Sequence, residues 1–140
     1  MNPIQILLVE DDEVVVMDIS RSLEKAKIIH NISVAPNGEQ AIQFLTKCAN
    51  EGKQFPDIVL IDINMPKMNG LELLEAIRGN ELWKHLKCFI ITTSDHKADR
   101  SAARKLDVTG YIIKPLKLNS PATMDTFNLM IDLLNFKSVG

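Results

Sequence analysis

Short apolar runs alternate along this chain with longer segments in which apolar residues recur every three or four positions. The runs at 4–9, 58–61 and 88–91 are almost entirely apolar, which is typical of strands buried on both faces of a parallel sheet. The run at 29–34 is more mixed in polarity and is expected nearer an edge of the sheet, and a short fifth run covers 111–113. The pattern therefore predicts five strands.

The segments between the runs have the spacing of helices that bury one apolar stripe. We predict a helix after each strand, the first ending near 27, the third near 79–80, and the last covering about 120–135. Segment 81–87, which contains Trp83, is expected to be a short amphipathic piece. Strands that alternate with helices favour an α/β fold, here a doubly wound five-stranded parallel sheet with five helices. The helical residues expected to face the core are Val15, Ile19, Leu23 and Ala26; Ala41, Ile42, Leu45 and Cys48; Leu71, Leu74 and Ile77; and Ala98, Ala102 and Leu106.

Composition limits the partners and the compartment. The 140 residues suffice for one domain with a substantial core, and the formal net charge of −2, without a Lys/Arg cluster, argues against nucleic acid as the main partner. No apolar run approaches the ~20 residues that cross a bilayer, and the chain starts without a signal-peptide pattern, so we expect a cytoplasmic protein outside the membrane. Cys48 and Cys88 lie far apart in apolar stretches, which favours reduced core thiols.

Polar residues follow the predicted strands at the points where the strands end. They are Glu10, Asp11, Asp62, Thr92 and Lys114. Each of them alone is readily explained as a turn cap or a solvated strand end. Because parallel strands all end at the same edge of the sheet, however, these side chains are expected to gather in one crevice, where ligands of such folds bind.

Three clustered carboxylates repel one another and call for a cation. Oxygen ligands with no His or Cys nearby indicate a hard ion, and Mg²⁺ (or Mn²⁺) suits Glu10, Asp11 and Asp62. A metal and a lysine together suit a transferring phosphoryl group, with Asp62 as the nucleophile. Thr92 is positioned to donate its hydroxyl to one phosphoryl oxygen, and Lys114 to neutralise another.

The chain resembles the receiver domain of bacterial two-component response regulators over almost its whole length. The resemblance rests on four motifs in order: ILLVEDD ending at Asp12, DIVLIDINMPKMNG from Asp57 to Gly70, IITTS around Thr92, and GYIIKP from Gly110 to Pro115. It implies the flavodoxin-like receiver topology.

The resemblance also assigns roles within the strand-end cluster. It implies that Asp62 accepts phosphate from a histidine kinase or a histidine phosphotransfer protein, and that Glu10, Asp11 and the main-chain carbonyl of Asn64 help hold the metal. Thr92 and Tyr111 occupy the positions of the family's switch residues. Such a protein catalyses only its own aspartyl phosphorylation and dephosphorylation, so it is not expected to be an enzyme acting on a separate substrate.

Two features refine the resemblance. The acidic pair is Glu10-Asp11 where many members have Asp-Asp, which preserves the charge. The longer segment from Cys48 to Pro56, together with the motifs, resembles the small stand-alone regulators of phytochrome-type histidine kinases. We therefore expect a single receiver domain over 1–140 without an output domain.

Other functions on the same sheet remain alternatives. A phosphatase of the haloacid-dehalogenase type carries a second Asp two residues after its nucleophile, where this chain has Asn64. A flavin-binding protein needs a glycine- and hydroxyl-rich loop after the first strand, where this chain has Glu10, Asp11 and Asp12. A phosphorylation-independent protein-docking module is the remaining alternative.

Two surfaces are candidates for partner binding. Val14 and Met17 lie opposite the core stripe of the first helix and close to the acids, so they are candidates for docking a histidine kinase or phosphotransfer protein. The last predicted helix carries a second apolar stripe of Leu129, Leu133 and Phe136, opposite the one that would seat it on the sheet. A helix that is apolar on two sides is normally buried, so we predict a homodimer through these residues.

Overall fold

The computed structural model describes residues 3–25, 27–63, 68–92 and 97–113. Helices and strands alternate along this part of the chain, as the hydrophobic pattern predicts. The elements are β1 (Ile4–Val9), α1 (Glu13–Lys25), β2 (His30–Ala35), α2 (Gly38–Asn50), β3 (Ile58–Asp62), α3 (Gly70–Arg78), β4 (Lys87–Thr92), α4 (Lys97–Lys105) and β5 (Gly110–Ile113). The predicted fifth helix, with the dimer residues Leu129, Leu133 and Phe136, lies outside the described residues.

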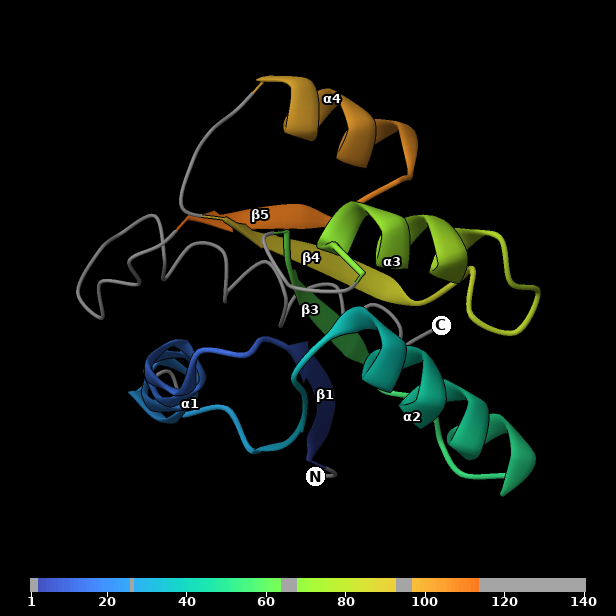
Figure 1. The fold of residues 1–140 in the computed structure, drawn as a ribbon. Helices are drawn as coiled ribbons and strands as arrows, with labels where there is room; N and C mark the ends of the chain where they lie inside the picture. The colour runs from blue at the N-terminus through green and yellow to red at the C-terminus, as the bar shows by residue number, and fades with distance from the viewer. Residues whose placement is uncertain (1–2, 26, 64–67, 93–96, 114–140) are drawn as a thin grey trace, which may run out of the picture.

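The five strands form one parallel sheet in the order β2-β1-β3-β4-β5. The order confirms the doubly wound fold and places the mixed-polarity strand β2 at an edge, as predicted. Helix α1 lies on one face of the sheet, and α2 and α3 lie together on the other, with α4 beyond them next to β5 (Figure 1). The central strand β3 is buried along its whole length, because it has neighbouring strands on both sides and helices over both faces.

Each face of the sheet packs its own hydrophobic core. On the α1 face, the side chains of Val15, Ile19 and Leu23 meet alternate residues of the strands. On the other face, α2 contributes Ala41 and Leu45, and α3 contributes its own apolar stripe. The described residues of the helical stripes read from the sequence therefore face the sheet in α1, α2 and α3, and the predicted Ala26 lies outside the described residues.

The structure refines two local expectations. Residues 81–86 of the short amphipathic piece form turns that lead into β4, and its Trp83 is buried in the core. Among the α4 side chains that the structure describes, Ala103 is fully buried and Ala102 of the expected stripe is half-buried. Leu106, which follows the helix, is also half-buried, and the side chain of Ala98 lies outside the described part. The helix is short and otherwise polar, so only its packing against α3 decides which of its alanines is covered.

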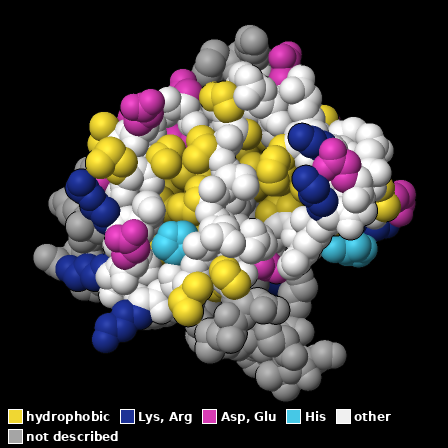
Figure 2. All heavy atoms as spheres, turned by 90° about the horizontal axis from the view of Figure 1, so that it is seen from below, with side chains coloured by type: hydrophobic (Ala, Val, Ile, Leu, Met, Phe, Trp, Pro, Cys, Tyr) yellow, Lys and Arg dark blue, Asp and Glu magenta, His cyan; other side chains and the backbone are white. Residues whose placement is uncertain are grey.

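The exposed surface carries few large apolar side chains. Among the described residues these are Val14, Met17, Ile29, Val34 and Leu82. Seen from below, hydrophobic side chains gather in the middle of the molecule, with acidic and basic side chains around them (Figure 2). None of the helices in the described ranges is both long enough and apolar enough to cross a bilayer.

Candidate functional site

The strand register places the predicted site residues side by side at the ends of neighbouring strands. Val9 pairs with Ile61, so Glu10 follows β1 beside Asp62, the last residue of β3. On the other side of β3, Asp62 pairs with Ile91, and Thr92 comes next on β4. We call this edge of the sheet, where the strands end, the carboxyl edge.

Glu10, Asp11 and Asp62 form an acidic cluster at the carboxyl edge. One carboxylate oxygen from each residue lies within 4.8 Å of the others. Glu10 and Asp62 are buried, with 1% and 4% of their surface exposed, whereas Asp11 is exposed to solvent. The sequence-based prediction that these three carboxylates converge is therefore confirmed in the structure.

The donor set of the acidic cluster fits a hard divalent cation. Its ligands are carboxylate oxygens from two neighbouring strand ends, and burial of two of them weakens the screening of their mutual repulsion by water. Magnesium takes oxygen ligands and keeps several waters, so an open side at the exposed Asp11 also suits it. The third acid of the sequence motif, Asp12, has another task.

Asp12 caps the helix that starts beside the acidic cluster. Its Oδ1 accepts the Val14 N–H at 2.9 Å, and its carbonyl accepts the Val16 N–H at 3.2 Å. The Asp12 N–H in turn donates to Oε1 of Glu10 at 3.1 Å. These bonds fix the turn between β1 and α1 and thereby orient the carboxylate of Glu10.

Gly70 shapes the other wall of the site, and the sequence did not reveal this role. It is the first residue of α3, and its N–H donates to the carbonyl of Ile63 at 3.0 Å. A Cβ added at Gly70 would lie 2.4 Å from the main-chain oxygen of Asp62. Only glycine allows α3 to begin this close to the end of β3. The capping box of Asn69 and Glu72 fixes the same helix start.

Some of the remaining predicted site residues lie within the described residues and others lie outside them. The main chain of Thr92 ends β4 at the carboxyl edge, and Tyr111 lies in β5, half-buried against the α2–α3 core. Asn64 and Lys114 lie outside the described residues. Val14 and Met17, the predicted docking residues, are 64% and 51% exposed on α1, which begins directly after the acidic turn.

Comparison with known proteins agrees with this geometry. The family model of the response regulator receiver domain matches residues 6–123. The chain is 33% identical over 115 residues to the probable methanogenesis regulatory protein FilR2 of Methanothrix harundinacea, covering 82% of this chain and 74% of that protein. It is 32% identical over 117 residues to the response regulator Rcp1 of Synechocystis, covering 83% of this chain and 80% of Rcp1.

Solved structures give the same result. The Mn²⁺-bound form of response regulator Rcp1 superposes with a TM-score of 0.72 at 30% identity, covering 91% of this chain and 89% of that one. The phosphorylated cyanobacterial phytochrome response regulator RcpA superposes with a TM-score of 0.74 at 26% identity, covering 96% and 94% of the two chains.

Proposed function

The chain belongs to the response regulator receiver domain family, and from this premise we propose that Asp62 accepts a phosphoryl group and switches the signalling state of the protein. Receiver domains are phosphorylated by histidine kinases or histidine phosphotransfer proteins, and we assign this chain a donor of that kind. The proposal makes it a regulator that modifies only itself. It is not an enzyme with a separate substrate.

The observation that carries the proposal is the convergence of Glu10, Asp11 and Asp62 within 4.8 Å at the carboxyl edge. Burying two carboxylates beside a third is unfavourable for a protein that only needs to cap a turn. The same arrangement is useful if a cation and a phosphoryl group come to the site. The Mn²⁺-bound form of Rcp1 and the phosphorylated form of RcpA are both similar to this chain, which supports that use.

In the proposed reaction a carboxylate oxygen of Asp62 attacks the phosphorus atom of a phosphohistidine. The new bond joins that oxygen to phosphorus, the bond from phosphorus to the histidine nitrogen breaks, and its electron pair stays on the nitrogen, which binds a proton. Mg²⁺ or Mn²⁺ held by Glu10, Asp11, Asp62 and the main-chain carbonyl of Asn64 would supply positive charge for the phosphoryl oxygens. The close start of α3 at Gly70 fixes the main chain of Asp62, and the turn at Asp12 orients Glu10 beside it before the donor arrives.

Three further residues complete the proposed switch. The Thr92 hydroxyl binds one phosphoryl oxygen of phosphorylated Asp62, and the ammonium group of Lys114 binds another. Tyr111, two strands away from Asp62, changes its packing when Thr92 moves toward the phosphoryl group. These roles rest on the matching motifs of the family and on the position of Thr92 at the carboxyl edge.

We further propose that Val14 and Met17 contact the histidine-bearing partner. Both side chains are exposed on the helix that begins next to the acidic cluster, so a partner that covers them brings its histidine toward Asp62. Phosphorylation changes this surface and the one around β4 and β5, and these changes carry the signal to a downstream protein.

Incubation with Mg²⁺ and acetyl phosphate, followed by intact-mass measurement, tests the chemistry. The wild type should gain the mass of one phosphoryl group, and Asp62→Asn should gain none. Asp57→Asn is the matched control, because Asp57 lies at the other end of β3, and this variant should be labelled like the wild type. An unlabelled wild type would favour the phosphorylation-independent docking module instead.

A second assay separates docking from chemistry. Val14→Ser/Met17→Ser should slow phosphoryl transfer from a phosphorylated histidine kinase at least about tenfold, and should leave labelling by acetyl phosphate unchanged. Equal losses in both assays would show general damage and would refute the docking role of the two residues.

A further inference from the structure

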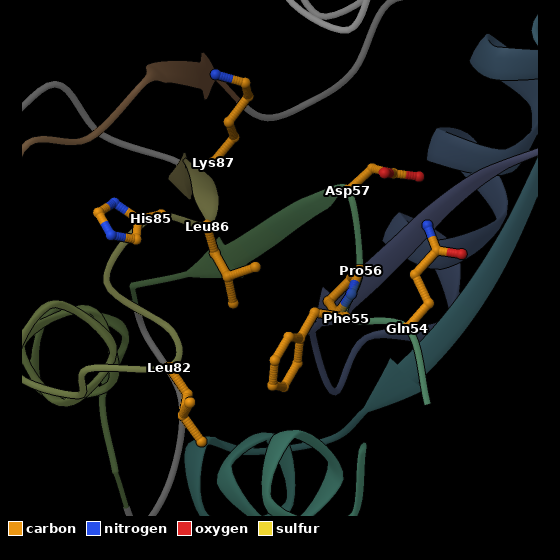
Figure 3. A pocket seen from close by; sticks show the side chains of 8 residues that line it. All are labelled: Gln54, Phe55, Pro56, Asp57, Leu82, His85, Leu86 and Lys87. Atoms are coloured by element: carbon orange, nitrogen blue, oxygen red, sulfur yellow. The ribbon is translucent and has the colours of Figure 1, made fainter. Parts of the chain in front are cut away.

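Large apolar side chains are exposed at three places on the described surface. Val14 and Met17 belong to the docking surface proposed above. Leu82 borders the hollow shown in Figure 3, in which the charged side chains point away from the apolar ones, so its lining indicates no particular ligand. Ile29 and Val34 lie at the third place, which is the edge strand β2 and the residue before it.

Strand β2 has an open side. In the described sheet only β1 lies beside it. The carbonyls of Ile29 and Ala35 accept N–H groups at the two ends of β1, at 2.9 and 3.0 Å. Because the main-chain groups of successive strand residues point to alternate sides, the N–H and C=O groups of His30, Ile32 and Val34 point away from β1. Among the described residues these outward groups have no main-chain partner.

The sequence leaves this edge unprotected. Proteins usually protect an edge strand with charged side chains, proline, a bulge or a very short strand. Segment 28–35 contains no Lys, Arg, Asp, Glu or Pro, and the six residues of β2 pair with β1 without a bulge. The strand at the opposite edge, β5, has four residues and is followed in the sequence by Lys114 and Pro115. The edge at β2 is therefore the one suited to pairing with another strand.

A second copy of the same strand fits this edge in the antiparallel direction. A two-fold axis at Ile32 places this residue beside Ile32 of the second copy, and His30 beside Val34 of the second copy. Of the registers in which outward groups face each other, this one pairs all three residues. Their side chains lie on one face of the sheet, the face on which Ile32 packs against the α1 core, so the pairing also covers apolar surface of Ile32 and Val34.

Charges at the two ends of β2 favour the same arrangement. Lys27 precedes the strand and Glu39 follows it, and both are exposed. Neither forms an ion pair in the part of the chain that the structure describes. An antiparallel pair places Lys27 of one copy and Glu39 of the other at the same end, whereas a parallel pair would place like charges together.

We propose that two copies of this chain pair through β2 and form one continuous sheet. Main-chain hydrogen bonds of His30, Ile32 and Val34 hold the two copies together, and the packing of Ile32 and Val34 adds apolar contact. Because the two strands are antiparallel, the two acidic clusters face in opposite directions. The pairing depends neither on the proposed role of Asp62 nor on the homodimer predicted through the last helix.

Amide hydrogen exchange of the ¹⁵N-labelled protein, followed by NMR, tests the pairing. The outward amides of His30, Ile32 and Val34 should exchange about threefold more slowly at about 1 mM than at about 50 μM protein, by mass action. The amides of Asn31 and Ser33 point toward β1 and should be protected at both concentrations. Rapid exchange of the outward amides at both concentrations would overturn the proposal. Equal protection at both would also overturn it, because another part of the same chain would then cover the edge.

Substitutions at the edge and at its ends locate the interface. Val34→Lys adds a protecting charge at a half-exposed position and should abolish the concentration dependence at Ile32. Lys27→Glu should weaken it, and Lys27→Glu/Glu39→Lys should restore it. Val14→Ser/Met17→Ser is the control on α1 and should leave it unchanged. An unchanged dependence in Val34→Lys, or its loss in the α1 control, would refute pairing through β2. No phosphodonor or divalent cation is needed, so a negative result leaves the phosphorylation proposal untouched.

Discussion

An aspartate lies at each end of β3, and the groups around the two carboxylates differ. Asp57 precedes the strand at the amino edge, the edge of the sheet where the strands begin. There its carboxylate accepts the Gln5 N–H at 2.9 Å, and its own N–H donates to the Gln5 carbonyl at 2.7 Å. Asp62 ends the strand at the carboxyl edge, where its carboxylate lies within 4.8 Å of those of Glu10 and Asp11. One aspartate completes the hydrogen bonding of a neighbouring strand, and the other is placed among like charges.

The surroundings of a carboxylate distinguish a structural role from a functional one more clearly than its burial does. A structural carboxylate is matched by donors within its own fold, so its removal leaves a donor without a partner. A carboxylate held beside two others is repelled by them, and a bound cation relieves that repulsion. The acidic cluster of the carboxyl edge is accordingly suited to a ligand, and Asp57 to the stability of the chain.

The two ends of α3 offer the strongest test of this contrast. At Gly70 an added Cβ would lie 2.4 Å from the Asp62 carbonyl oxygen, so Gly70→Ala should lower the free energy of unfolding by about 3 kcal/mol. At Gly79, which caps the other end, the nearest atom to an added Cβ is 3.4 Å away and φ is −84°. Gly79→Ala should therefore be neutral or slightly stabilising. Urea unfolding measures both values, and equal effects would show that α3 does not constrain the end of β3.

Divalent cations should affect only the carboxyl edge. At a Mg²⁺ concentration of 100 times its dissociation constant, the free energy of unfolding should rise by about 2.7 kcal/mol, measured as an increase in melting temperature. Asp11→Asn removes a carboxylate that is exposed and should abolish most of this increase without damage to the core. Asp57→Asn should keep it. An unchanged Mg²⁺ response in Asp11→Asn would mean that the acidic cluster does not bind the ion.

Without divalent cations, the two aspartates of β3 should respond to substitution with opposite signs. Asp57→Ala removes the acceptor of the Gln5 N–H and should cost about 1–2 kcal/mol. Asp62→Asn relieves repulsion within the acidic cluster and should stabilise the protein by about 1 kcal/mol. Chemical unfolding in EDTA provides both numbers. A destabilised Asp62→Asn would indicate that the carboxylate of Asp62 also supports the fold.

The strands and the acidic cluster were predictable from the sequence because both depend on simple regularities. Apolar runs such as 58–61 have few alternatives to a buried strand, and parallel strands must end at a common edge. The positions of Glu10, Asp11 and Asp62 follow from these two facts before any coordinate is known. The edge position of β2 follows from its mixed polarity.

Features that depend on tertiary contacts were not predictable. The guanidinium of Arg78 donates to the carbonyls of Leu106 and Asp107 at 2.8 and 3.0 Å, 28 and 29 positions away, and no local pattern indicates such bonds. The close approach of Gly70 to Asp62 depends on where α3 begins, and the burial of Ala103 depends on how α4 meets α3. Spacing shows which residue types lie on a face, but the neighbouring element decides which of them is covered.

The smallest predicted effect concerns Cys88, near the amino edge in β4. Burial raises the pKa of its thiol to about 11, against an ordinary value of 9.0, while the nearby Arg78 acts in the opposite direction. Between these two pH values the unfolded chain releases the thiol proton and the folded chain keeps it, so the unfolded state binds fewer protons and stability falls as pH rises. At pH 7, well below both values, the thiol is protonated in both states and contributes nothing to the pH dependence. Relative to Cys88→Ala, the wild type should lose about 1 kcal/mol of its free energy of unfolding between pH 7 and pH 10. The difference in free energy of unfolding between the two proteins at pH 7 reports only the change in packing. Urea unfolding of both proteins from pH 7 to pH 10 measures the difference, and parallel curves would show that the thiol of Cys88 titrates alike in the folded and unfolded chains.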